Sequence, residues 1–195
     1  HLIRNMVEYL VVMGTTGETP TLSREEKREV LQYAVERVNA RVPVVVGMGG
    51  NNTAEVVLSI LEMECKGADA ILSVSPYYNK PQQQGIYEHF RIIAEASPVP
   101  VILYTVPGRT GGNINPETTL KLASDCENII GIKEASGNFT QIFHLLKHRP
   151  DHFLVISGDD SITLPLLSAG VDGLISVAAN AYPREISDMV RAGLN

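Results

Sequence analysis

The stretch Asn128-Ile-Ile-Gly-Ile-Lys-Glu-Ala-Ser136 is apolar along most of its length and carries one lysine near its end. Apolar residues on both faces are typical of a strand buried on both sides, as in a parallel sheet. Strict alternation along a strand predicts two faces: Gly131, Lys133 and Ala135 on one, and Ile130, Ile132 and Glu134 on the other. The lysine would then lie between two small side chains that leave space around it.

Similar apolar runs occur along the whole chain, and each is followed by a turn and a charged stretch with helical periodicity. Their starts lie 20 to 35 residues apart, which is the length of a strand–helix unit. Strands that alternate with helices predict a parallel α/β fold. The predicted strands are Tyr9–Met13, Val44–Met48, Ala70–Val74, Val101–Val106, Ile129–Ala135, Phe153–Ser157 and Gly173–Val177.

The composition is that of a globular protein: 195 residues with 44% hydrophobic and 19% charged side chains. The formal net charge of −6 disfavours nucleic-acid binding. No apolar run is long enough for a membrane helix, and no signal peptide precedes the first predicted strand. The two cysteines, Cys65 and Cys126, have no metal-binding spacing, which indicates reduced thiols and a cytoplasmic protein without a metal site. We expect one domain over residues 1–195.

Two architectures fit such a chain, an open doubly wound sheet and a (β/α)8 barrel. Polar candidates lie at or just after the C-terminal ends of four different predicted strands: the Gly14–Glu18 loop, the Pro76–Pro81 loop, Tyr104 with Arg109, and Lys133. A doubly wound sheet gathers its site at one switch point, whereas a barrel gathers it from the C-terminal ends of many strands. The distribution therefore favours the barrel.

These side chains suggest a chemistry. Burial lowers the pKa of a lysine, which an amine nucleophile requires. From this strand alone, a strand-end lysine paired with a neighbouring carboxylate is the favoured alternative. A phenol such as Tyr104 can transfer protons, and the Arg109 guanidinium can hold a carboxylate. Taken alone, both also fit an ordinary core tyrosine and a surface arginine.

Five segments together resemble the dihydrodipicolinate synthase family of pyruvate-dependent class I aldolases. They are GTTGE at 14–18, PYYNKP at 76–81, YTVPGRTG at 104–111, GIKEASG at 131–137 and SGDD at 157–160. The resemblance implies a TIM (β/α)8 barrel that is incomplete here, with strands 2–8 present and the first βα unit and C-terminal helices missing. It also implies condensation of pyruvate with L-aspartate 4-semialdehyde in lysine and diaminopimelate biosynthesis.

The resemblance also implies residue roles. Lys133 forms the Schiff base with pyruvate, and Tyr104 moves protons. Thr15 and Tyr78 complete a hydroxyl relay with Tyr104, and Tyr78 reaches the site from a neighbouring subunit of a homotetramer. The substrate-binding positions implied are Thr16 and Ile175 for pyruvate, Arg109 for the semialdehyde carboxylate, and Gly158 near the same site. The family needs no metal or organic cofactor.

A second, regulatory site is implied only in part. Asn51, Glu55 and Tyr77 match positions that contact lysine in lysine-inhibited members. Pro20, Arg24 and Lys27 occupy neighbouring positions that are Ala or His in those members. Two added cations repel a lysine ammonium, so we expect weak or absent lysine inhibition. Two further departures from the family pattern are Thr105 in place of Asn and Met6 in place of a Gly that ends a helix.

Two rival functions remain. Another pyruvate-dependent aldolase, such as N-acetylneuraminate lyase or a keto-deoxy-sugar aldolase, would keep Lys133 and Tyr104 but lack Arg109. A non-catalytic barrel that binds a small anion would have no need of Lys133 within a strand.

Overall fold

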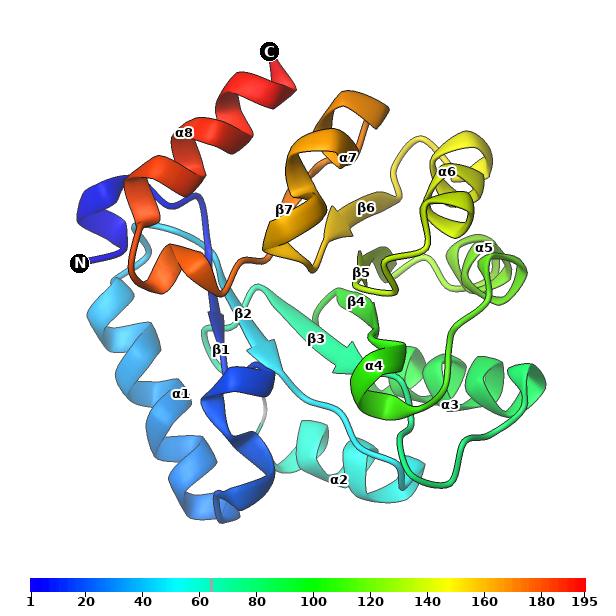
Figure 1. Cartoon of the computed structure of the whole chain (residues 1–195). Helices are drawn as coiled ribbons and strands as arrows, with labels where there is room; N and C mark the ends of the chain where they lie inside the picture. Colours follow the sequence, from blue (N-terminus) through cyan, green and yellow to red (C-terminus); the bar gives the residue numbers. More distant parts are fainter. Residues whose placement is uncertain (64) are drawn as a thin grey trace.

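The computed structural model describes residues 1–63 and 65–195, and its described strands form one parallel sheet in the order of the sequence (Figure 1). The sheet curls, and the helices lie along its outer side. The strands are β1 (Leu10–Val12), β2 (Val44–Gly47), β3 (Ala70–Val74), β4 (Val101–Thr105), β5 (Ile129–Glu134), β6 (Leu154–Ser157) and β7 (Gly173–Leu174). The predicted strand–helix alternation is therefore confirmed.

Each strand leads into a turn and then a helix. The helices are α1 (Arg24–Val38), α2 (Thr53–Met63), α3 (Gln83–Ala96), α4 (Pro107–Thr110), α5 (Pro116–Asp125), α6 (Phe139–His148), α7 (Thr163–Ala169) and α8 (Pro183–Leu194). Ser23 begins α1 with a capping box, in which its hydroxyl accepts from the N–H of Glu26 while the Glu26 carboxylate accepts from the N–H of Ser23. None of the helices in the described part of the chain is long and apolar enough to span a bilayer.

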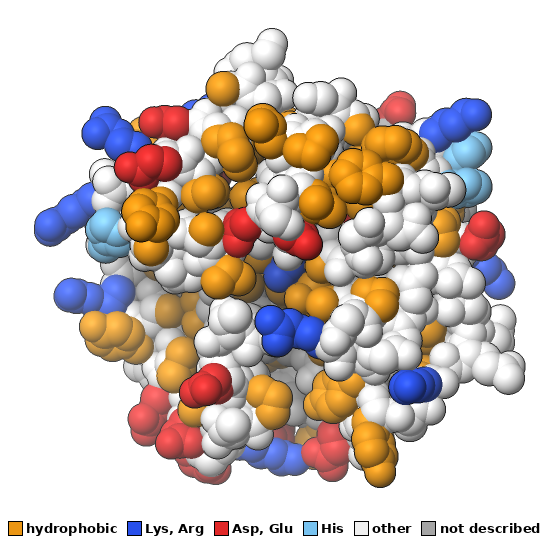
Figure 2. All heavy atoms as spheres, in the orientation of Figure 1, with side chains coloured by type: hydrophobic (Ala, Val, Ile, Leu, Met, Phe, Trp, Pro, Cys, Tyr) orange, Lys and Arg blue, Asp and Glu red, His pale blue; other side chains and the backbone are white. Residues whose placement is uncertain are grey.

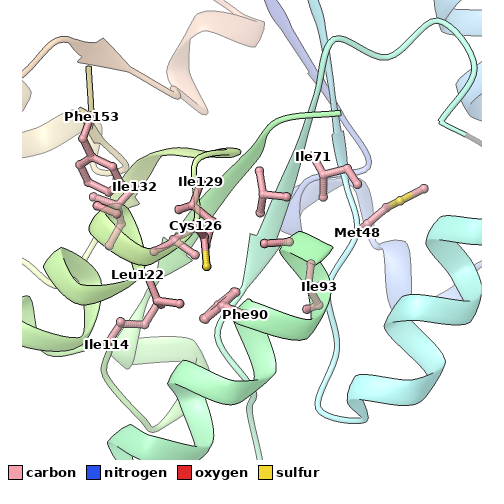
Figure 3. Close-up of a cluster of buried hydrophobic side chains, with 14 of the residues drawn as sticks. Met48, Ile71, Phe90, Ile93, Ile114, Leu122, Cys126, Ile129, Ile132 and Phe153 are labelled. Atoms are coloured by element: carbon pink, nitrogen blue, oxygen red, sulfur yellow. The ribbon is translucent and has the colours of Figure 1, made fainter. Parts of the chain in front are cut away.

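The two faces of the sheet hold two separate layers of buried side chains. The outer layer packs the strands against the helices, and Figure 3 shows part of it, including Phe90, Ile93 and Ile132. The inner layer lies within the curve of the sheet and contains Tyr104 and Ile175. Alternation along the strands sends neighbouring residues to opposite layers, which places polar candidates inside the curve.

The strand β5 departs from strict alternation. Its pairing with β4 shifts register, because Val101 pairs with Ile129 whereas Ile102 pairs with Gly131. Ile130 consequently packs against the inner layer rather than on the outer side with Ile132, so its predicted face is wrong. Beyond the bulge the alternation resumes.

The first and last strands of the sheet are shorter than the sequence pattern predicts. The strand β7 contains Gly173 and Leu174 alone, and β1 is half-buried along its length. These two strands do not pair in the described structure, but the Tyr9 hydroxyl donates a hydrogen bond of 2.8 Å to the carbonyl of Leu174. A side chain thus connects the two ends of the sheet.

Met6 ends a short 3-10 helix (η1, Ile3–Asn5) in the left-handed region, with φ of 68°. Glycine adopts this conformation without strain, whereas a residue with a Cβ does so at a cost. The position therefore has the backbone of a helix-ending glycine although methionine occupies it.

Candidate active site

Lys133 and Tyr104 are adjacent at the C-terminal ends of two neighbouring strands. They are partners in the register between β5 and β4, and the Lys133 Nζ lies 4.2 Å from the centre of the Tyr104 ring. Both side chains are buried, with 8% and 5% of their surface exposed. An amine and a phenol thus face each other where the sequence predicts them.

The environment favours the neutral amine of Lys133. Burial lowers its pKa from 10.5 to about 8, the positive charge of Arg109 acts in the same direction, and the carboxylate of Asp160 opposes them. No carboxylate of the described residues forms an ion pair with Lys133. The alternative of a strand-end lysine paired with a carboxylate therefore has no support in the geometry.

Gly158 lies directly behind the Lys133 side chain. A Cβ at this position would lie 2.9 Å from the Lys133 Cε and 2.8 Å from the Ala135 Cβ. The Gly158 N–H donates to the Glu134 carbonyl at 2.8 Å, which fixes this backbone against β5. Only glycine leaves the room that the lysine stem occupies.

A cavity of about 490 Å³ lies at this end of the sheet. Residues from several strand ends line it, among them Gly14, Thr15, Tyr77, Tyr104 and Arg109. Figure 2 shows this face hollowed near its middle, with basic and acidic side chains close to the hollow. Its lining mixes apolar side chains such as Leu72 and Val74 with a few polar ones, which is typical of a site for a small organic molecule.

The Gly14–Glu18 loop forms a turn of 3-10 helix (η2, Thr15–Gly17) directly after β1. The Thr19 hydroxyl donates to the Met13 carbonyl at 2.7 Å and so holds the turn against the strand end. Gly47 allows close approach from β2, because a Cβ there would lie 2.0 Å from the same Met13 oxygen. Thr15 and Thr16 are exposed on this turn.

The structure does not bring every predicted residue to the cavity. The predicted site residues that do not line it are Thr16, Tyr78, Lys133, Gly158 and Ile175. Tyr78 is 88% exposed and has a φ of 72°. Ile175 is buried in the inner layer that also contains Tyr104. Arg109 is exposed on the short helix α4 and lines the cavity.

Asp160 is a residue whose surroundings the sequence did not reveal. Its neighbour Asp159 caps the short 3-10 helix Asp160–Ile162 by accepting from the Ser161 N–H at 2.9 Å. The Asp160 Oδ2 instead accepts from the N–H groups of Val177 and Ala178, each at 3.0 Å. The sequence does not distinguish two adjacent aspartates, and their different hydrogen-bond partners are visible only in the folded chain.

Behind Lys133, on the outer side of β5, a buried polar network holds the segment after α4. The Glu134 carboxylate accepts from Gln141 Nε2 at 2.6 Å, and Gln141 in turn accepts from Asn113 Nδ2 at 2.7 Å. Thr105 donates to Asn113 Oδ1 at 3.0 Å and accepts from the Ile114 N–H at 3.2 Å. The unusual Thr105 thus fixes the chain that follows the Arg109 turn.

A second cavity, of about 330 Å³, collects the residues of the expected lysine site. Arg24, Lys27, Asn51, Glu55 and Tyr77 all line it. The Arg24 guanidinium lies 2.8 Å from the Glu55 carboxylate, and the same side chain also pairs with Glu62 at 3.0 Å. The carboxylate that would meet a cationic ligand therefore already has a cationic partner.

Comparison with known proteins identifies similar chains. The model of the dihydrodipicolinate synthetase family matches residues 1–195. A 4-hydroxy-tetrahydrodipicolinate synthase of Flavobacterium psychrophilum is 56% identical over all of this chain and 66% of its own. The synthase structure from Methylacidiphilum fumariolicum SolV superposes with a TM-score of 0.97 at 43% identity, over 100% of this chain and 65% of that one.

A lysine-bound synthase structure from Cyanidioschyzon merolae superposes with a TM-score of 0.96 at 43% identity, over 100% of this chain and 66% of its own. The chain thus spans about two thirds of the length of the relatives it matches. These neighbours share the barrel arrangement of parallel strands and outer helices that the sequence pattern favours.

Proposed function

Because the chain belongs to the dihydrodipicolinate synthetase family, we propose that this protein condenses pyruvate with L-aspartate 4-semialdehyde to form 4-hydroxy-tetrahydrodipicolinate. The observation that carries the proposal is the buried Lys133 amine, with its pKa of about 8, against the Tyr104 ring. At pH 7 about a tenth of such lysines are neutral, far more than for an ordinary lysine. We place the reaction in a single catalytic domain in the cytoplasm.

The proposed reaction begins at the Lys133 nitrogen. Its lone pair attacks the ketone carbon of pyruvate, and loss of water leaves a protonated imine. Loss of a proton from the methyl carbon gives an enamine, with the electron pair drawn toward the nitrogen. The enamine carbon then attacks the aldehyde carbon, and the substrate's amino group displaces Lys133 as the ring closes.

The other candidate residues have supporting roles in this reaction. Tyr104 moves protons at the imine and the carbonyl, in a relay with Thr15 and Tyr78. Thr16 and Ile175 hold the pyruvate carboxylate beside Gly158, and Arg109 holds the carboxylate of the semialdehyde. The lysine imine supplies the electron sink, so the reaction requires no metal or organic cofactor.

Borohydride reduction tests the Schiff base in the full-length protein. Pyruvate with borohydride should add one reduced pyruvyl group to Lys133, detected by peptide mass, and Lys133→Ala should abolish the adduct. Lys147→Ala, a change on the exposed end of α6, is the matched control and should keep it. Absence of an adduct in the wild-type protein would end the aldolase hypothesis.

Turnover distinguishes this synthase from the sugar aldolases and from an anion-binding barrel. The wild-type protein should consume aspartate semialdehyde, and Arg109→Ala should raise the KM for that substrate while leaving the pyruvate adduct intact. Cleavage of N-acetylneuraminate in place of this condensation would favour the rival aldolase.

We propose that Tyr78 acts in a neighbouring subunit of a homotetramer, built as a dimer of dimers. The exposure of its side chain, at 88%, supports this role. Mixing Tyr78→Phe protein with Lys133→Ala protein tests it, because hybrid dimers would contain one complete site. About a quarter of wild-type activity should return after subunit exchange. No recovery in mixtures that demonstrably exchange subunits would contradict the proposal.

The second cavity supports weak or absent inhibition by lysine. Arg24 forms an ion pair with Glu55, and Lys27 adds a further positive charge to the lining of this cavity. Asn51 and Tyr77 line the same cavity. The double variant Arg24→Ala/Lys27→Ala should gain sensitivity to lysine, whereas Arg37→Ala at the far end of α1 should not. Half-inhibition of the wild-type enzyme by submillimolar lysine would refute this expectation.

A further inference from the structure

Asp160 begins a short 3-10 helix (η4, Asp160–Ile162) in the loop between β6 and α7. Its Oδ2 accepts two hydrogen bonds of 3.0 Å from the backbone N–H groups of Val177 and Ala178, which follow β7. One carboxylate oxygen therefore ties together the loops that leave two adjacent strands. The segment that it holds begins just after Ile175, whose N–H donates to the Ser157 carbonyl at 2.9 Å.

The second oxygen of the same carboxylate has no such partner. Asp160 Oδ1 is buried and makes no hydrogen bond with any described residue. A buried carboxylate oxygen without a partner is costly unless a positive charge lies close by. A positive charge near Oδ1 would offset this cost.

The loop that contains Asp160 lies against Lys133, because a Cβ at Gly158, two residues before Asp160, would lie 2.9 Å from the Lys133 Cε. The Tyr104 ring of β4 lies 4.2 Å from the lysine amine, and the charges of Arg109 in α4 and Asp160 in η4 both act on its pKa. Asp160 is the one that favours a positive charge on the amine, whereas burial and Arg109 oppose it. Asp160 and Lys133 form no direct ion pair, so the lysine nitrogen stays free to react.

We propose that Asp160 is a positioning residue and the counter-ion of the Lys133 nitrogen, holding the segment after β7 in place with one oxygen and balancing the cationic imine with the other. The inference deepens the proposed Schiff-base function and rests on it. The nitrogen is positively charged again once the imine forms, in a site where a cation has little solvation. A fixed carboxylate that forms no direct ion pair with the nitrogen can stabilise the cationic imine and still leave the amine free to attack pyruvate.

The experiment separates charge from shape in the full-length protein. Asp160→Asn keeps an oxygen for the Val177 and Ala178 N–H groups but removes the negative charge. The rate of borohydride-trapped adduct formation with pyruvate is measured against pH. The midpoint of its rise should move to lower pH by about half a unit or more, because the lysine loses the group that raises its pKa. At a pH above the midpoint, the pyruvate concentration for half-maximal adduct should rise severalfold.

Three comparisons make the result decisive. Asp159→Asn is the matched control, because Asp159 only accepts from the η4 backbone and hydroxyl, and its midpoint should stay at the wild-type value. Asp160→Ala, a second neutral variant, should shift the midpoint in the same direction, whereas Asp160→Glu should shift it less. Equal midpoints in the wild-type, Asp160→Asn and Asp160→Ala proteins, at whatever rate, would overturn the inference. A wild-type protein that forms no adduct would instead overturn the proposed function itself.

Discussion

The pKa of Lys133 has a direct kinetic consequence. Only the neutral amine attacks pyruvate, so adduct formation should rise with pH through a midpoint of about 8. Adduct formation by the full-length protein, quenched with borohydride at a series of pH values and counted by mass, measures the midpoint. A rise centred near 10.5, the value of an unperturbed lysine, would show that burial does not tune this amine.

The glycine behind the lysine stem permits a second prediction. Gly158→Ala places a methyl group 2.9 Å from the Lys133 Cε, so the amine must shift from its position beside Tyr104. Adduct formation should fall by about tenfold to a hundredfold, because small displacements of reacting atoms are costly. Gly173→Ala is the control, since its Cβ would meet nothing within 4 Å. An unchanged rate in Gly158→Ala protein would contradict the prediction.

Between elements, a buried histidine joins two helices. His89 in α3 bonds through Nδ1 to the Thr53 hydroxyl at the start of α2, at 2.8 Å, while its Nε2 is buried without a partner among the described residues. Burial lowers its pKa from 6.5 to about 4. The unfolded chain takes up a proton at this position at a pH where the folded chain does not.

Stability should therefore fall as pH falls from about 6.5 toward about 4, and the histidine should contribute nothing to this slope above 6.5. Over that range the cost amounts to about 3 kcal/mol. His89→Asn, which keeps a polar atom near Thr53, should flatten the slope, while exposed His152→Asn should preserve it. Urea unfolding at several pH values measures the difference, and parallel slopes in His89→Asn and wild-type proteins would refute the assignment.

Across the whole molecule, Tyr9 links the first and last strands through the Leu174 carbonyl. Tyr9→Phe removes that hydrogen bond and leaves the ring, so the free energy of unfolding should fall by about 1 kcal/mol. Tyr33→Phe is the control, because that side chain is 65% exposed. Thermal unfolding compares the three proteins, and equal loss in both variants would argue against a specific role for the link.

Much of this architecture is predictable from sequence because buried parallel strands are continuous apolar runs. The strand–helix order and the adjacency of Lys133 and Tyr104 follow from that pattern, since parallel strands bring their C-terminal ends to one side. The face of Ile130 was mispredicted because a register shift leaves no local mark in the sequence. The role of Asp160 depends on a contact with Val177 across two loops, which no local pattern encodes.

The separation of the sheet into an outer and an inner layer has a consequence for how such a protein changes over time. Outward residues such as Phe90 and Ile132 hold the helices on the sheet, while Tyr104 and Lys133 point into the curve. Selection for a new substrate can therefore act on one set of positions while selection for folding acts on the other. Substitutions that alter preference should accumulate on the inward face and at the loops, and leave the helix-facing side largely intact.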